Sequence, residues 1–314
     1  MGTRATGMRV VGTARDRLAP YVFIFPFIVF FLFLFLFPAL YSLVLSVHRY
    51  RGFGPMIFVG LNNFTSVFRY SVFWQAVRNN LFYLAFSALP VIVFSFLAAL
   101  AVRTRKITFQ RIIKPMIFLP HMMAVMAATL VWRVIFSTNY GVINAVLGTR
   151  IPFLERPDLM RWSVVILMFW RSLGWFFVVY LAGLTTVSDD VREAARIDGA
   201  NALQTTVRIV IPIMKPIFLF TFLNETIHTL KIFTEPTILI SGWLSGPPET
   251  KPIMGIMVDY VRSGSFGRGA AAGWIIFLGI LVVSLVCLVM AFGWACESND
   301  RYAGAYEAQG KTGE

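Results

Sequence analysis

Three polar residues that can exchange protons or form hydrogen bonds, Asn224, Glu225 and His228, lie together in an otherwise apolar stretch of the chain. Residues four apart share one face of a helix, so Asn224 and His228 point the same way. Arg171 lies in a second apolar stretch. Ionisable side chains at membrane depth are costly and tend to face a bundle interior or an aqueous cavity. These residues are therefore candidates for contacting a polar solute, and pairing of Glu225 with Arg171 or another helix purely for packing is the alternative.

Other residue types are not arranged for catalysis. The apolar stretches hold no His, Asp and Glu cluster, no nucleophile with a base, and no metal-ligand spacing. Gly304 to Thr312 reads glycine, five residues, then Gly-Lys-Thr, which is one residue too long for a phosphate-binding loop. We therefore predict no catalytic residue, no metal site and no cofactor bound by this chain.

Six apolar segments are each long enough to cross a bilayer. Hydrophobic residues make up 58% of the 314 residues and charged residues only 14%, which excludes a soluble two-domain enzyme. A helix of about 20 residues spans a hydrocarbon core of roughly 30 Å and satisfies its own backbone hydrogen bonds. The predicted spans are Tyr21–Val47, Asn79–Val102, Pro115–Phe136, Trp162–Leu184, Ile209–Leu230 and Trp274–Cys296. The prediction is an all-α integral membrane protein with six transmembrane helices.

The distribution of Lys and Arg predicts the orientation of these spans. With the N-terminus inside, the inner segments hold 14 of these residues and the outer segments 11. The first outer loop opposes this bias because it holds four arginines and no acid. Tryptophans support it, since an interfacial belt would place them at the outer ends of the spans, where we find Trp74, Trp132, Trp162 and Trp274.

This orientation divides the chain into a cytoplasmic N-terminal tail at 1–20, a transmembrane domain at 21–296 and a polar cytoplasmic tail at 297–314. The net charge of +13 is spread over short clusters between apolar runs, so it indicates membrane topology and not a nucleic-acid partner.

The inner loop over 185–208 predicts two short helices outside the bilayer. Asp189 or Asp190 can cap the first helix, and Gly199 ends it before a second helical stretch begins at Asn201. The first helix carries small and acidic side chains that suit docking to another protein: Glu193, Ala194, Ala195 and Asp198. An ordinary capped surface helix between two spans is the alternative.

This loop resembles the EAA loop of the membrane subunits of binding-protein-dependent ATP-binding-cassette importers. The pattern is Glu193-Ala194-Ala195, three residues, Gly199, nine residues, Ile209, one residue and Ile211-Pro212, with Ile211 where the family usually has Leu. The segment from Glu193 to Ala200 is similar to the carbohydrate branch, which includes the maltose and glycerol-3-phosphate permeases. Further similar positions extend from about Tyr21 to Gly293: Val59–Phe64, Phe118–Pro120, Trp132, Arg133, Gly141, Asn144 and Leu181–Leu184. The sequence departs from the family at Ile240 to Pro248, where a Thr-x-Gly-Gly-Pro type sequence is usual.

The resemblance implies the permease subunit of an ATP-driven importer, forming half of the pathway for a sugar or related solute. It also implies the partners: a second homologous permease subunit, two ATPase subunits that bind ATP and Mg, an extracytoplasmic solute-binding protein, and membrane lipid. The loop residues Glu193, Ala194, Ala195, Asp198 and Gly199 would couple to the ATPase subunits. The location implied is the bacterial or archaeal cytoplasmic (inner) membrane, with both termini cytoplasmic.

Within such a permease, polar groups would meet the hydroxyls of a sugar and aromatic faces would meet its rings. The candidates for this pathway are Arg171, Asn224, Glu225, His228, Trp170 and Trp175. An anionic solute such as glycerol-3-phosphate is an alternative, because of the arginines in the first outer loop. A secondary transporter is another alternative, which would need its own coupling-ion site and usually internal repeats.

Overall fold

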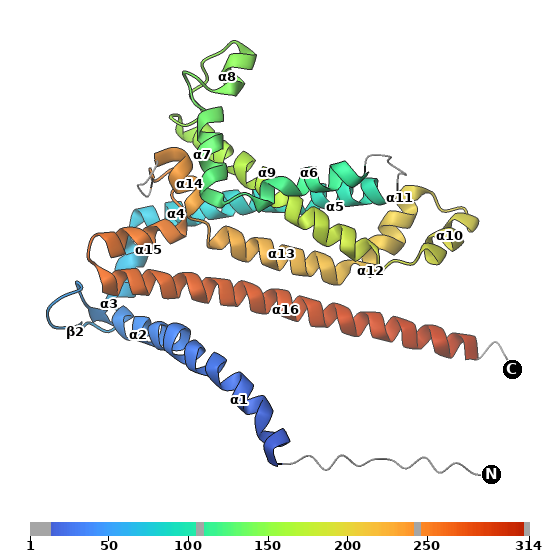
Figure 1. Ribbon diagram of the computed structural model, residues 1–314, viewed down its shortest axis with the longest axis horizontal. Coiled ribbons are helices and arrows are strands. Elements are labelled where there is room, and N and C mark those ends of the chain that lie inside the picture. Colours follow the sequence, from blue (N-terminus) through green and yellow to red (C-terminus); the bar gives the residue numbers. More distant parts are fainter. Residues whose placement is uncertain (1–13, 105–109, 242–245, 311–314) are drawn as a thin grey trace.

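The computed structural model describes residues 14–104, 110–241 and 246–310, with side chains described for 21–103, 110–240 and 246–290. Helices form most of this part of the chain (Figure 1). Parts of the predicted tails and of the segment from Ile240 to Pro248 lie outside the described residues.

Four of the predicted spans are continuous helical stretches, two of them interrupted only by a single π-helical turn (Figure 1). The first runs through α1 (Ala14–Phe31), the turn Leu32–Leu36 and α2 (Phe37–Ser46), and the second through α4 (Ser71–Tyr83), the turn Leu84–Ala88 and α5 (Leu89–Thr104). The third continuous stretch is α9 (Pro157–Leu184), and the fourth is α16 (Phe266–Gly310), which extends into the segment predicted as a polar tail.

The other two predicted spans are bent pairs of helices. α6 (Gln110–Met122) and α7 (Val125–Ile135) meet at 97°, and the stretch Ala202–Ile213 meets α13 (Lys215–Leu230) at 70°. The second bend falls at Met214, between Pro212 and Pro216. Proline removes a backbone donor and clashes with the preceding turn, which explains a break at this point. The structure thus has four long apolar helices, or up to six spans if each bent pair counts as one.

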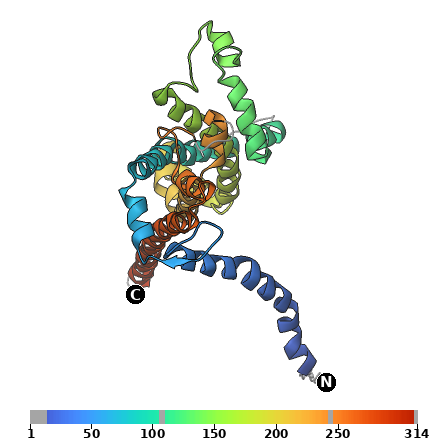
Figure 2. The ribbon, with the colours of Figure 1, turned by 90° about the vertical axis from the view of Figure 1, so that its left-hand side faces the viewer.

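The core of the bundle forms where α5, α6, α9 and α13 pack together (Figures 1 and 2). Large buried side chains on α5 and α9, including Phe96, Phe177 and Tyr180, fill the space between them. Gly174 lets α9 approach α6 closely, because a Cβ atom there would lie 2.3 Å from the carbonyl oxygen of Ile117. This close contact fixes the path of the helix that carries Arg171.

The end of the bundle opposite the 185–208 loop holds most of the short elements (Figure 1). They are β1 (His48–Arg49), β2 (Ile57–Phe58), α3 (Asn62–Arg69), α14 (Thr234–Pro236), its following π-helical turn Thr237–Ser241, and α15 (Ile253–Arg262). Buried Asn80, on α4, connects this helix to the end of α13 and to the start of α15. Its amide donates to the carbonyl of Thr229 at 2.8 Å and accepts from the backbone N–H of Ile253 at 2.9 Å.

The first part of the first span, α1, packs little against the rest of the chain, whereas α2 lies against α16 (Figure 2). The side chains of the span, among them Phe23, Phe27 and Phe33, are largely exposed. Such a continuous apolar surface is stable only in lipid or against another protein.

Candidate functional site

The 185–208 loop forms two short helices, α10 (Asp189–Ile197) and α11 (Ala202–Thr205). The expected cap of α10 was wrong by one residue, because the hydroxyl of Ser188 accepts from the Val191 N–H and the aspartates occupy the first turn. Acidic residues there favour the positive end of the helix dipole. The expected break at Gly199 is confirmed, since its φ of +81° suits glycine and few other residues. Asn201 begins α11 through a reciprocal pair of hydrogen bonds with Gln204.

Most of the predicted docking residues lie on the surface of α10 and of the turn that follows it. Glu193, Ala194, Asp198 and Gly199 are exposed, whereas Ala195 is buried against the chain. The loop also exposes large apolar side chains that the sequence analysis did not select, and Ile197 is 82% and Leu203 72% exposed. Exposed apolar groups next to charged ones are typical of a protein interaction surface.

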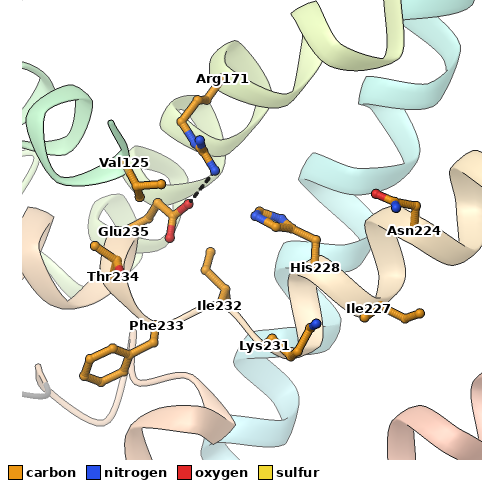
Figure 3. A pocket seen from close by; sticks show the side chains of 10 residues that line it. All are labelled: Val125, Arg171, Asn224, Ile227, His228, Lys231, Ile232, Phe233, Thr234 and Glu235. Carbon is orange, nitrogen blue, oxygen red and sulfur yellow. Dashed lines mark hydrogen bonds and ion pairs between the residues drawn. The ribbon is translucent and has the colours of Figure 1, made fainter. Parts of the chain in front are cut away.

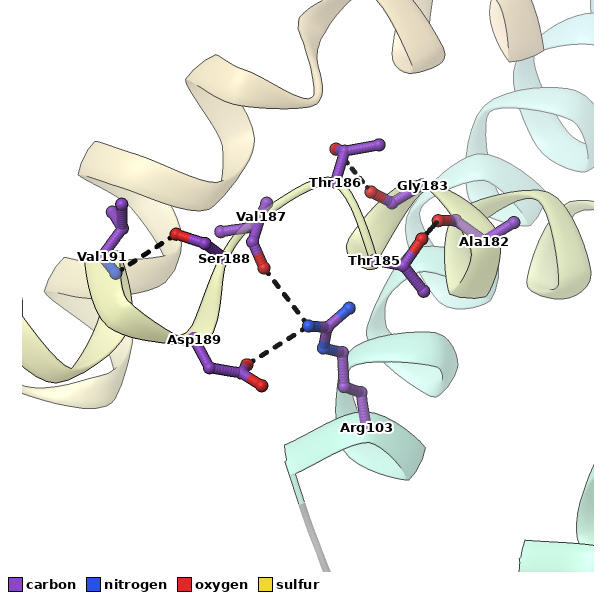
Figure 4. Close-up of polar contacts among 9 residues, drawn as sticks. All are labelled: Arg103, Ala182, Gly183, Thr185, Thr186, Val187, Ser188, Asp189 and Val191. Carbon is purple, nitrogen blue, oxygen red and sulfur yellow. Dashed lines mark hydrogen bonds and ion pairs between the residues drawn. The ribbon is translucent and has the colours of Figure 1, made fainter.

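Arg103, at the end of α5, holds the start of this loop in place (Figure 4). Its guanidinium donates to the backbone carbonyl of Val187 at 3.2 Å and to the carboxylate of Asp189 at 3.3 Å. The Arg103 side chain is largely buried, while Asp189 is exposed. Arg103 therefore connects a helix of the bundle directly to the first turn of α10.

An arginine of the loop itself, Arg192 on α10, has two guanidinium nitrogens, Nε and Nη2, that are buried without a hydrogen-bond partner among the described residues. Burial lowers the pKa of its guanidinium from the usual range, and the nearby positive charge of Arg103 adds to this effect. Arginine remains protonated in proteins, so Arg192 is a cation with two buried donors that have no acceptor among the described residues.

The second candidate region is a cavity of about 360 Å³ between α9, α13 and α14 (Figure 3). Three predicted pathway residues, Arg171, Asn224 and His228, contribute to its lining. The remaining lining residues are Val125, Ile227, Lys231, Ile232, Phe233, Thr234 and Glu235. The cavity therefore combines hydrogen-bonding groups of both kinds with apolar surface, as small-molecule sites do.

The partner of Arg171 is Glu235 and not Glu225. The Arg171 Nη2 atom lies 3.4 Å from the Glu235 Oε1 atom, and the two side chains are 10% and 5% exposed. This ion pair joins α9 to the short helix α14, which follows the end of α13. Because a buried charge is costly without a partner, the pair fixes α14 beside the cavity.

Glu225 is also buried but does not line the cavity. The Nδ1 atom of His228, one turn away on α13, lies 4.0 Å from a carboxylate oxygen of Glu225. That distance is too long for a hydrogen bond.

The two predicted tryptophans lie outside this cavity. Trp170 contacts Trp132 edge to face at a ring distance of 5.5 Å. Trp175 stacks on His121 at 5.3 Å. Both sit on α9, as Arg171 does, but they point toward other neighbours.

Arg103, Lys231 and Glu235 are among the residues of these two regions that sequence analysis missed. The available signal for Glu235 was an acidic residue directly before the apolar run Pro236–Ile240. Arg103 and Lys231 gave no such signal, because each is one of several cations at the end of an apolar stretch.

Comparison with known proteins places the chain in a family. Residues 82–293 match the family described as binding-protein-dependent transport system inner membrane component. The chain is 29% identical to the lactose transport system permease protein of Rhizobium radiobacter, over 87% of this chain and 96% of that protein. It is 28% identical to the arabinooligosaccharides transport system permease protein of Bacillus subtilis, over 88% of this chain and 89% of that protein.

A solved structure shares the fold. It is the crystal structure of a bacterial ABC transporter involved in the import of the acidic polysaccharide alginate, with a TM-score of 0.76 and 23% identity. The match covers 88% of this chain and 96% of that chain. The chain belongs to the family of binding-protein-dependent transport system inner membrane components, and is thus a multi-pass membrane permease.

Proposed function

We propose that this chain is the permease subunit of an ATP-driven importer and forms half of the pathway for a sugar or a related solute. The observation that carries the proposal is the family match over residues 82–293. Relatives named for lactose and arabinooligosaccharide transport match nearly the whole chain, which supports a saccharide as the solute.

The proposed topology has six spans, with each bent pair of helices crossing the membrane once. The 185–208 loop and the end of α16 lie at the same end of the molecule (Figure 1), which supports a cytoplasmic position for both. The tails at 1–20 and 297–314 would then be cytoplasmic, flanking a permease domain at 21–296. The larger number of Lys and Arg residues in the inner segments supports this orientation.

The proposed ATPase-coupling element is α10 together with the turn after it, with Glu193, Ala194, Ala195, Asp198 and Gly199. Glu193, Ala194 and Asp198 are exposed. Ile197 is exposed as well, and it offers an apolar side chain that an ATPase subunit could bury. Ala195 would act from inside, because its small side chain lets α10 pack against the chain. Arg103 would pass a displacement of α10 on to α5. ATP and Mg would bind the ATPase subunits and not this chain.

The proposed solute pathway includes the cavity between α9, α13 and α14. Asn224, His228 and Thr234 supply hydrogen-bonding groups for hydroxyls, while Arg171 and Glu235 set the charge of the lining. Glu225, Trp170 and Trp175 would support the pathway from behind the lining or contact solute at another stage of transport.

The proposed partners are a second homologous permease subunit, two ATPase subunits and a solute-binding protein. A transporter of the same fold has a structure in complex with an alginate pentasaccharide-bound periplasmic protein, which supports the binding-protein partner. The uncovered surface of α1 and α2 supports contact with lipid and with a second membrane subunit.

The experiment is purification of the tagged protein from its native membrane in mild detergent, with mass spectrometry of the bound proteins. We expect one more permease, an ATPase and a binding protein. The complex in proteoliposomes should take up the saccharide recognised by that binding protein only when ATP is supplied. A chain that purifies alone and moves solute without ATP would contradict the proposal and favour a secondary transporter.

A further inference from the structure

The hairpin between the first and second spans exposes an apolar and cationic surface. We define this hairpin surface as Arg49, Arg51, Phe53, Ile57, Phe58 and Leu61. The exposed fractions are 83% for Phe53, 53% for Ile57, 70% for Phe58 and 68% for Leu61, and both arginines are exposed as well. Neighbouring residues of a strand point to opposite faces, and both residues of β2 are exposed. The chain therefore covers neither face of this strand.

The base of the hairpin is firmly held, so this exposure belongs to a fixed structure. The buried side-chain amide of Asn63 donates to the carbonyls of Ser46 and His48 at 2.8 and 2.9 Å. The backbone of α16 packs directly beneath, since a Cβ atom at Gly267 would lie 2.0 Å from the His48 carbonyl oxygen. The hairpin surface is thus presented in a defined orientation relative to the bundle (Figures 1 and 2).

The position of the hairpin along the first span sets its depth. The span Tyr21–Ser46 has 26 residues, and β1 begins two residues after its end. At 1.5 Å per residue this apolar part of the helix, which itself begins at Ala14, is about 39 Å long, which exceeds a hydrocarbon core of about 30 Å and nearly matches a bilayer with its headgroups. The hairpin therefore begins at the level of the lipid headgroups.

The charge of this region selects the kind of lipid. No Asp or Glu occurs between Arg17 and Leu154, so the arginines of the hairpin surface have no acidic partner within the segment that carries them. Aromatic and aliphatic side chains favour the boundary between headgroups and acyl chains, while arginine favours phosphate oxygens. We propose that the hairpin surface binds anionic phospholipid headgroups and inserts Phe53 and Phe58 at the acyl boundary. This anchor does not depend on which solute the permease carries.

Depth measurement by spin labelling tests the insertion. The complete complex, with both native cysteines replaced by Ser, is labelled at Phe53→Cys and reconstituted in nanodiscs containing phosphatidylglycerol. We expect oxygen to enhance the spin relaxation of the label more than a water-soluble nickel chelate does. The ratio of the two effects should place the label roughly 5–10 Å below the phosphates. The matched control is Val146→Cys on α8 (Val142–Leu147), where the native side chain is apolar and 81% exposed but distant from the first span. A label at this position should be accessible to the nickel chelate in water.

Measurement of lipid affinity tests the role of the two arginines of the hairpin surface. The variant Arg49→Gln/Arg51→Gln should bind phosphatidylglycerol about 25-fold more weakly in native mass spectrometry, because one cation near an anionic surface contributes about fivefold. The control Arg150→Gln/Arg156→Gln removes two exposed arginines elsewhere and should leave the affinity unchanged. A label at position 53 that remains accessible to water in the nanodisc would overturn the proposal. The proposal would also be overturned if the label became inaccessible to water only after the solute-binding protein is added, because that result would assign the hairpin surface to protein docking.

Discussion

Replacing Glu235 by Leu is expected to destabilise the protein strongly, because it leaves the buried Arg171 guanidinium without its countercharge. At the observed separation of 3.4 Å, two unit charges attract by about 5 kcal/mol at an effective dielectric constant of about 20. Removing one partner of a buried pair typically costs about 3–5 kcal/mol. We expect the lower part of this range, because the pair borders a cavity that admits water.

The assay is the thermal unfolding midpoint of the purified complex in one detergent, where we expect a decrease of roughly 5–10 °C. The matched control is Asp158→Asn, which breaks the shorter ion pair of 2.8 Å between Arg156 and Asp158. Both of those side chains are 60% exposed, so this change should barely move the midpoint. Equal shifts for the two variants would refute the reasoning that burial, and not distance, determines the strength of these pairs.

The double variant Arg171→Met/Glu235→Leu separates packing from transport. Replacing a buried ion pair by apolar side chains of similar size is often neutral, so the unfolding midpoint should recover to near that of the unmodified protein. If the charges form part of the solute pathway, ATP-driven uptake in proteoliposomes should remain at least tenfold lower despite this recovery. Uptake at the original rate would show that the pair serves packing alone.

Three other predictions concern the 185–208 loop and the opposite end of the bundle. Arg103→Gln should lower uptake per ATP hydrolysed more than Asp189→Asn does, since it also removes the bond to the Val187 carbonyl; equal ratios in proteoliposomes would contradict this. Gly199→Ala places a side chain on a residue with left-handed backbone conformation, at a cost of about 1–2 kcal/mol, and should reduce ATP-driven uptake. Gly148→Ala also adds a side chain at a positive φ but lies far from the 185–208 loop, so it should leave uptake unchanged. Asn80→Ala removes one buried and one partly buried hydrogen bond and should lower stability by about 2–4 kcal/mol, measured as the unfolding midpoint; a change below the error of the assay would show that water replaces the amide.

Features that depend on neighbouring residues were predictable from the sequence. The apolar segments indicated the helices, because a helix satisfies its backbone within the segment. Gly199 and Asn201 indicated where α10 ends and α11 begins, because positive φ and side-chain capping are local properties. The cap of α10 was misplaced by one residue because Ser188 and both aspartates are all good capping residues.

Features that depend on residues far apart in the sequence were decided by the tertiary structure. Sequence analysis considered Glu225 as the partner of Arg171, and the structure pairs Arg171 with Glu235, 64 positions away, because the turn after α13 brings α14 back against α9. Trp170 and Trp175 are close to Arg171 in the chain but face other helices, since consecutive residues of a helix point in different directions.

The sequence by itself determined the class of the protein, the approximate helices and the local shape of the 185–208 loop. The tertiary structure alone decided which charges meet, which residues line the cavity and which helix holds the 185–208 loop. The physical reason is that hydropathy and capping act within a few residues, whereas an ion pair between α9 and α14 depends on the packing of whole helices.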